Sequence, residues 1–116
     1  MTKFVGHCHG GKVKFEIETT LDYSARCNCS LCRRRGAVMH YVPEQNFTLI
    51  EGEDYLSLYQ FHTHTAKHYF CRQCGIYPFH RPRTRLGHYG VNVGCLEGVD
   101  VFALEPELLS DGALME

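Results

Sequence analysis

Residues 12–18 read KVKFEIE, and this stretch decides the fold class. The apolar side chains of Val13, Phe15 and Ile17 alternate with lysines and glutamates. A period of two puts the apolar side chains on one face of a β-strand and the charged side chains on the other face. We therefore expect a half-buried strand here.

Short strand-like runs make up most of the remaining sequence. Further strands are expected at residues 38–42, 47–50, 55–61, 66–70 and 89–93. Glycines and prolines separate these runs, as is typical of turns. Only residues 104–109 look helical, and Pro106 interrupts that pattern. The sequence predicts a single domain over residues 1–116 that is mainly β and mostly antiparallel, either a sandwich or two packed sheets.

The composition limits the classes of partner. The 116-residue chain has 12 basic and 13 acidic residues, a formal net charge of −1. A near-neutral chain without a long basic run argues against nucleic-acid binding, and no apolar run approaches the length of a membrane span. Residues 1–20 lack the apolar centre of a signal peptide. We expect a cytoplasmic protein that binds neither nucleic acid nor membrane.

The cysteine content is high, and the number is odd. Seven cysteines in 116 residues do not form a closed set of disulfides. In a reducing compartment, clustered cysteines more often bind metal or take part in chemistry. The sequence therefore predicts metal sites rather than a disulfide framework.

The densest cysteine cluster is Cys27, Cys29 and Cys32. Residues i and i+2 of an extended strand lie about 6.7 Å apart. Two sulfurs on one tetrahedral zinc ion, each at about 2.3 Å from it, must be closer than about 4 Å. The segment must therefore curl, and Asn28 and Ser30 are residue types that favour curled loops. Three thiolates this close would repel each other without a cation.

A second group is expected from Cys71 and Cys74, which flank a turn that ends at Gly75. Cys8 precedes the first predicted strand and could reach this pair, which gives three ligands for a second site. Structural zinc prefers four protein ligands, while catalytic zinc keeps one position open. The compact group on one loop is the better candidate for an open, catalytic site.

Other candidate functional residues surround these groups. Arg33, Arg34 and Arg35 follow the first cluster and could offset its negative charge or bind the carboxylates of a substrate. Cys95 could be an extra ligand, a reactive thiol or a small buried apolar residue, and the last interpretation is slightly favoured. A general acid or base could come from any of five unranked histidines: His62, His64, His68, His80 and His88.

Taken together, these motifs resemble one known family. In chain order they are Gly6-His7-Cys8-His9, Cys27-x-Cys29-x-x-Cys32-Arg33-Arg34-Arg35-Gly36-Ala37, Tyr59-x-Phe61, Phe70-Cys71-x-x-Cys74-Gly75 and Val91-Asn92-Val93-Gly94-Cys95-Leu96. The pattern is similar to that of the glutathione-dependent formaldehyde-activating enzyme family, which includes the centromere protein V type. The resemblance extends from Gly6 to about Asp100.

The resemblance implies a β-tent fold of small antiparallel sheets stapled by zinc, with one or two zinc ions per chain. It implies that the first cluster holds catalytic zinc and that Cys8, Cys71 and Cys74 match three of four structural ligands. The family's fourth ligand is a cysteine two residues after the first, and this chain has Gly10 there. His9 or His7 could substitute, water could fill the place, or the site could be weak or empty.

The implied activity is that of a carbon–sulfur lyase, in which formaldehyde and glutathione, or a similar small thiol and aldehyde, combine reversibly as S-hydroxymethylglutathione. Two alternatives belong to other classes. One is a non-catalytic, zinc-stapled binding module of the same fold. The other is a thiol redox enzyme with Cys95 as nucleophile, similar in fold to methionine sulfoxide reductases of the B type.

Overall fold

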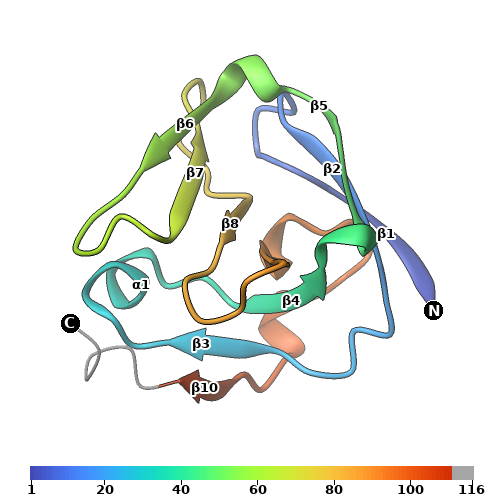
Figure 1. Cartoon of the computed structure of the whole chain (residues 1–116). Helices are drawn as coiled ribbons and strands as arrows, with labels where there is room; N and C mark the ends of the chain where they lie inside the picture. The colour runs from blue at the N-terminus through green and yellow to red at the C-terminus, as the bar shows by residue number, and fades with distance from the viewer. Residues whose placement is uncertain (111–116) are drawn as a thin grey trace.

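Two β-sheets form the framework of the molecule (Figure 1). The computed structural model describes the backbone of residues 1–110 and the side chains of residues 1–107. The strands in this part are β1 (Thr2–His7), β2 (Lys14–Thr19), β3 (Ala25–Cys27), β4 (Met39–Pro43), β5 (Phe47–Glu51), β6 (Leu56–Tyr59), β7 (Lys67–Cys71), β8 (Phe79–Arg81), β9 (His88–Asn92) and β10 (Glu107–Ser110). The helical segments are α1 (Ser30–Arg35) and the short 3-10 turns η1 (Glu44–Asn46), η2 (Glu53–Tyr55), η3 (Val93–Cys95) and η4 (Val101–Ala103).

The smaller sheet has the strand order β1-β2-β5, and the larger has the order β10-β3-β4-β9-β8-β7-β6. Neighbouring strands pair antiparallel, except that β10 pairs parallel to β3. In Figure 1, β6 and β7 form one side of a roughly triangular outline, β1, β2 and β5 a second, and β3 and β10 the base. This arrangement confirms the prediction of a mainly β fold made of small antiparallel sheets.

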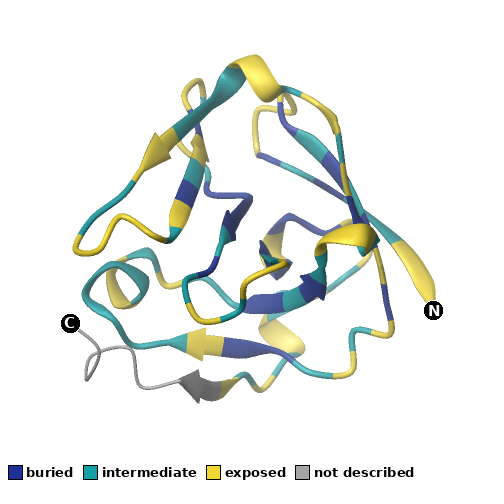
Figure 2. Cartoon of the chain, in the orientation of Figure 1, coloured by how far each residue is buried: buried dark blue, intermediate teal, exposed yellow. Residues whose placement is uncertain are grey.

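The core lies where the two sheets face each other, and Figure 2 shows the buried stretches concentrated there. Val13, Phe15 and Ile17 are all 0% exposed, so the alternation that indicated a strand also identified its buried face. Phe15 stacks on Phe47 at 5.6 Å between ring centroids and meets Phe79 edge-on at 5.8 Å. Aromatic pairs in these geometries stabilise a core beyond their buried area.

One glycine permits this packing. A Cβ atom at Gly6 would overlap the ring of Phe15, so β1 can lie against that ring only because residue 6 has no side chain.

The expected helix at residues 104–109 is wrong. Residues 104–106 are irregular, and the chain continues as β10, whose Glu107 N–H donates to the carbonyl of Ser24 at 3.1 Å. Pro106 supplies no N–H and pushes the preceding residue toward extended backbone. Pairing with the edge of β3 then gives the segment the hydrogen bonds that an interrupted helix would lack.

A helix was also missed at Ser30–Arg35. Two residues separate it from the strand β3, and its C-cap is Gly36, whose φ of 69° is left-handed. Gly at this C-terminal position and basic residues in the last turn are typical helix-end signals. Among residues 1–110, no helix has the length and apolar character needed to cross a membrane.

Candidate metal centres

The first cysteine cluster forms where β3 turns into α1. Cys27 is the last residue of β3, and Cys29 is the N-cap of α1, with its Sγ accepting a hydrogen bond from the N–H of Cys32 at 3.3 Å. This turn curls the chain as the spacing requires. The sulfur atoms of all three cysteines lie within 4.8 Å of one another. A small contraction would bring them to the separation of about 4 Å that a tetrahedral thiolate site needs.

The acidity of the thiols in this cluster indicates that they would ionise together only around a bound cation. The hydrogen bond with Cys27 and then burial raise the pKa of the Cys32 thiol, while Arg35 acts in the opposite direction. Three sulfurs this close cannot all be ionised without a positive charge between them. Soft thiolate donors suit zinc and other thiophilic metals. The residues therefore fit a metal ion, and the donor set offers three sulfurs.

Of the three consecutive arginines, Arg35 contacts the cluster. Its Nη2 donates to Cys32 Sγ at 3.5 Å, and its Nη1 donates to His68 Nδ1 at 3.3 Å. Its guanidinium also lies 3.5 Å above the ring of Tyr77. Arg34 instead donates to the carbonyl of Ser30 at 2.7 Å, and Arg33 and Arg34 are exposed. The structure thus separates one arginine at the site from two on the surface of α1.

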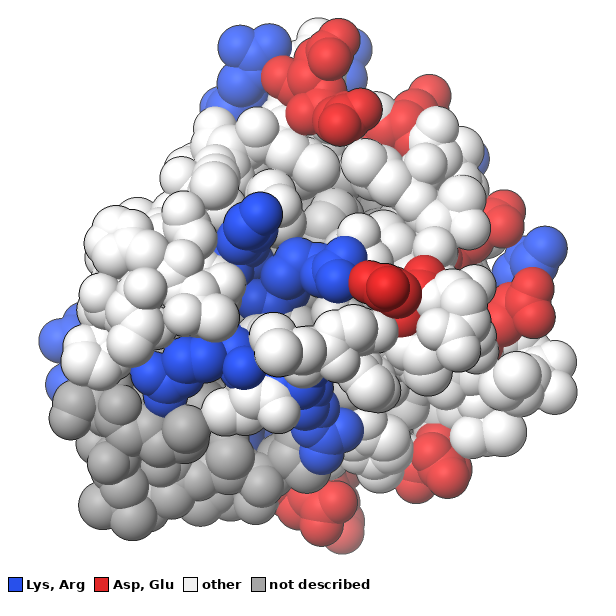
Figure 3. Space-filling model, in the orientation of Figure 1, with Lys and Arg blue, Asp and Glu red and all other residues white. Residues whose placement is uncertain are grey.

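A cavity of about 100 Å³ lies beside the first cluster. Besides the cysteines, its walls come from five parts of the chain: β4, the β6–β7 connection, β7, β8 and the β8–β9 loop at residues 82–87. The lining residues other than the cysteines are Tyr41, Phe61, His62, Thr63, Ala66, His68, His80, Pro82, Arg83 and Thr84. Figure 3 shows basic side chains gathered near the middle of this face of the molecule, with acidic side chains mostly toward its rim.

Two of the five candidate histidines, His68 and His80, form part of a buried network in the wall of the cavity. Their rings stack at 5.2 Å, and Tyr77 Oη is hydrogen-bonded to His80 Nδ1. Burial and then Arg35 lower the pKa of His68 to about 4, and burial likewise lowers that of His80 well below its ordinary value. Both imidazoles are therefore neutral at pH 7. His62 also lines the cavity, whereas His64 and His88 do not.

The tautomer of His68 follows from its partner. A guanidinium has only donors, so Nδ1 of His68 must accept the hydrogen bond from Arg35. The proton of the neutral ring is then on Nε2. His68 thus has a hydrogen-bond donor to offer and no charge.

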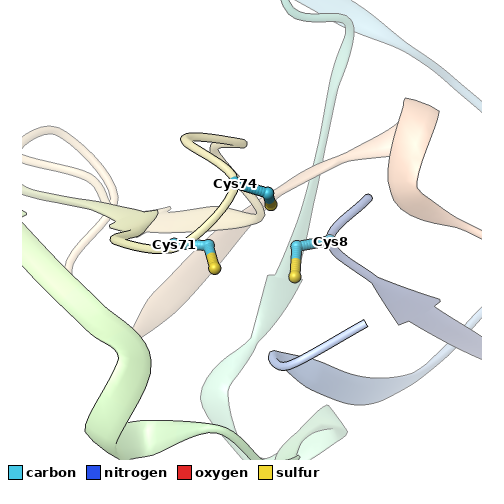
Figure 4. A group of neighbouring side chains, drawn as sticks. All are labelled: Cys8, Cys71 and Cys74. Carbon is cyan, nitrogen blue, oxygen red and sulfur yellow. The ribbon is translucent and has the colours of Figure 1, made fainter. Parts of the chain in front are cut away.

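The second cluster joins Cys8, which follows β1, to the turn that follows β7. Figure 4 shows Cys8 approaching from one side and Cys71 and Cys74 from the other. Their sulfur atoms lie within 4.8 Å of one another. The turn is closed by the N–H of Gly75, which donates to the carbonyl of Cys71 at 2.7 Å. This group could also hold a metal ion.

The thiols of the second cluster differ in acidity. Burial opposes ionisation of Cys74, but backbone hydrogen bonds from Gly10 and Ile76, helped by Cys71 and Cys8, lower its pKa to about 7. Burial raises the pKa of Cys71. One sulfur of this group is therefore ready to ionise near neutral pH, as a metal ligand must be.

Neither histidine beside Cys8 belongs to this group. His7 bonds through Nδ1 to the carbonyl of Cys8 at 3.0 Å and lies 3.3 Å from Glu97 through Nε2. His9 is exposed. Cys95 is 8% exposed, and its thiol lies 3.9 Å from the carbonyl of Tyr77. Within the described residues, each metal-ligand group contains three cysteines and no fourth side chain.

Comparison with known proteins identifies the family. The family model described as glutathione-dependent formaldehyde-activating enzyme matches residues 3–109. The chain belongs to this family. A protein from Rhodobacter sphaeroides with a known crystal structure is 44% identical to it, with a TM-score of 0.83 over 89% of this chain and 98% of that one. Both clusters of this formaldehyde-activating enzyme family member lie within the matched range.

Much of the site in this family member was not visible in its sequence. Tyr41, Tyr77 and Arg83 carry no motif of their own. The pairing of β4, β9 and β8 brings Tyr41 and Arg83 to the cavity beside the first cluster, and Tyr77 lies under the guanidinium of Arg35. The alternating arginines at residues 81, 83 and 85 were the feature of the sequence that could have pointed to Arg83 as a site residue.

Proposed function

We propose that this protein is a zinc-dependent carbon–sulfur lyase that forms and splits a thiol–aldehyde adduct. The preferred pair is formaldehyde and glutathione, with S-hydroxymethylglutathione as product. One observation carries the proposal: three cysteine sulfurs within 4.8 Å of one another line a small cavity in a member of the formaldehyde-activating family. We also propose a cytoplasmic location, because none of the seven cysteines forms a disulfide.

The reaction joins a sulfur atom to a carbonyl carbon. The S–C bond forms, the carbonyl π bond becomes an O–H bond, and the thiol proton ends on the oxygen, so nothing is oxidised or reduced. Zinc held by Cys27, Cys29 and Cys32 would stabilise the anionic form of a substrate thiol or polarise the aldehyde oxygen.

The protein groups around the cavity have separate tasks. Arg35 offsets the negative charge of the thiolate ligands through its contact with Cys32. His68 offers an uncharged N–H at Nε2 to the oxygen on which negative charge develops. Tyr41 keeps its phenolic proton, because burial, with Cys32 nearby, raises its pKa to about 12.

The size of the cavity favours a small aldehyde. The cavity beside the cysteines is about 100 Å³, well below the roughly 300–1,000 Å³ of pockets that enclose a drug-sized ligand. A one-carbon aldehyde and a thiol end fit this space, and a tripeptide does not. The body of the thiol substrate must therefore lie at the mouth, and holding both reacting groups together makes the addition effectively intramolecular.

The test is an assay of the zinc-loaded full chain with formaldehyde and a panel of thiols that includes glutathione. Elemental analysis first establishes the zinc content. We expect the adduct to form faster than in buffer and Cys29→Ser to abolish the difference. Full zinc content without any acceleration for the whole panel would exclude the lyase and favour the binding-module alternative.

A further inference from the structure

We propose that Arg83 binds a carboxylate of the thiol substrate and so determines which thiols this site accepts. This inference rests on the lyase function proposed above. It concerns a residue on the β8–β9 loop, whereas sequence reasoning had pointed to the arginines at positions 33–35.

Arg83 lies on the wall of the cavity that the first cysteine cluster also lines. Within that wall it is the only lysine or arginine among the described residues, and no aspartate or glutamate is present. Among the described residues that line the larger neighbouring groove, about 950 Å³, there is likewise no aspartate or glutamate. The chain has 13 acidic residues, one more than its basic ones, so the lack of acidic side chains in the described lining of both hollows is a local feature. An anionic ligand would therefore meet no carboxylate among the described residues of either lining.

The guanidinium of Arg83 is also uncommitted within the described part of the chain. It makes no hydrogen bond, ion pair or aromatic contact there, although its side chain is half-buried. The two flanking arginines are engaged. Arg81 lies 2.6 Å from a carboxylate oxygen of Glu44, and Arg85 lies 4.9 Å from the centre of the Tyr41 ring.

The other arginines near the cavity are less suitable to bind a substrate carboxylate. Arg35 is already engaged by Cys32, His68 and the Tyr77 ring. Arg26 lines the larger groove and is not part of the wall beside the cysteines. Arg83 is thus the guanidinium that faces the reacting end of a substrate and has its donors available.

The planar shape of the guanidinium indicates that Arg83 would bind a carboxylate. A guanidinium presents paired N–H donors that match the two oxygens of a carboxylate, and such charged hydrogen bonds are stronger than neutral ones. The cavity holds only the reacting end, so the carboxylate must sit at the mouth, a short chain away from the sulfur. A minimal probe is therefore a thiol that carries one carboxylate on a short chain; it tests the contact with the guanidinium and is a simpler ligand than glutathione, whose carboxylates lie further from the sulfur.

The experiment compares 3-mercaptopropionate with 2-mercaptoethanol as thiols for the zinc-loaded full chain, with formaldehyde in both cases. The variants are Arg83→Gln, Arg83→Lys and, as a control for loss of one positive charge, Lys3→Gln at an exposed position of β1. Circular dichroism and zinc analysis verify that each variant folds and holds metal.

We expect Arg83→Gln to lower kcat/KM for 3-mercaptopropionate about tenfold to hundredfold, mainly through KM, because a charged hydrogen bond is lost. The value for 2-mercaptoethanol should stay the same, Arg83→Lys should retain part of the preference, and Lys3→Gln should change neither. An unchanged preference in Arg83→Gln would overturn the proposal.

A binding measurement separates this proposal from the lyase function. The dissociation constant of each thiol is read from the visible spectrum of the cobalt-loaded protein and its Arg83→Gln variant. If no thiol is turned over, the lyase function fails, and Arg83 is judged on binding alone. Weaker binding of 3-mercaptopropionate, but not of 2-mercaptoethanol, would support its role, and equal binding by both proteins would overturn it.

Discussion

Arg35 Nη2 lies 3.5 Å from Cys32 Sγ, so a guanidinium from the last turn of α1 directly contacts the first cysteine cluster. The hydrogen bond with Cys27 and burial raise the pKa of Cys32, and the positive charge of Arg35 reduces that increase. Arg35 therefore helps the cluster to lose protons, which it must do to bind a metal ion.

Replacing Arg35 with methionine should weaken metal binding about tenfold to hundredfold at pH 7, the usual range for loss of an outer-sphere hydrogen bond. Competition against a chromogenic chelator measures the affinity. Arg34→Met is the matched control, because Arg34 is on the same helix and contacts the Ser30 carbonyl. Equal affinities for the two variants would show that the contact with Cys32 is unimportant.

His68 should remain neutral down to about pH 4, with its proton on Nε2. The pKa is depressed, so the folded protein binds this proton less tightly than the unfolded chain, whose histidine titrates near about 6.5. His68 therefore costs stability as the pH falls from 6.5 to 4 and has no such effect above that window. A ¹⁵N NMR titration of the imidazole gives both the pKa and the tautomer. Arg35→Met should raise the pKa, and a ring that titrates near 6.5 in the parent protein would contradict the prediction.

Changing Gly10 to cysteine should complete the second cluster. A Cβ atom at residue 10 would lie 3.3 Å from Cys74 Cβ and 3.7 Å from Cys74 Sγ, and 3.0 Å from Gln73 Oε1, which must move slightly. The new sulfur would approach the other three, and four thiolates bind structural zinc more tightly than three. We expect a higher melting temperature with zinc and slower zinc loss to a chelator. Gly10→Ser, which adds a similar volume without a thiol, should give neither gain; the same gain from serine would mean that packing is responsible.

Two cysteine variants distinguish the lyase from a redox enzyme. Burial, together with the smaller effects of Cys8 and Cys74, raises the pKa of Cys95 to about 12. Its thiol is therefore protonated at pH 7 and a poor nucleophile. Cys95→Ser should therefore retain metal content and most activity. Cys27→Ser should lose the activity and one metal equivalent per chain. If Cys95→Ser alone removed activity while metal content stayed constant, the thiol redox interpretation would be correct.

The packing of the cavity wall should require a residue without a side chain at Gly90. A Cβ atom at this position would collide with the imidazole of His80 and lie 2.9 Å from Cε1 of Tyr41. Because both side chains are packed, Gly90→Ala should reduce the free energy of unfolding by about 1–3 kcal/mol, as overpacking does. Urea unfolding of the metal-loaded protein measures the change. Gly94→Ala is the control, since its Cβ would meet only Asn92 Oδ1 at 3.3 Å, and a similar loss in both variants would contradict this account.

The sequence by itself determined the β class of the fold and the residues that compose the two cysteine groups. Alternation at Val13, Phe15 and Ile17 reports burial on one face of a strand, because neighbouring side chains of a strand point to opposite faces. The spacing of Cys27, Cys29 and Cys32 within six residues similarly forces a local turn. Both signals depend on residues close together in the chain.

The tertiary structure decided what surrounds those groups. Arg83, Tyr41 and His68 meet the first cluster only because β4, β9, β8 and β7 pair side by side in one sheet, and no local pattern encodes that proximity. The same long-range pairing made residues 107–110 a strand beside β3, where the sequence indicated a helix. Hydrogen bonds to a distant strand edge there outweigh local helix propensity, which is worth only tenths of a kcal/mol per residue, about 0.7 at most for ordinary residues.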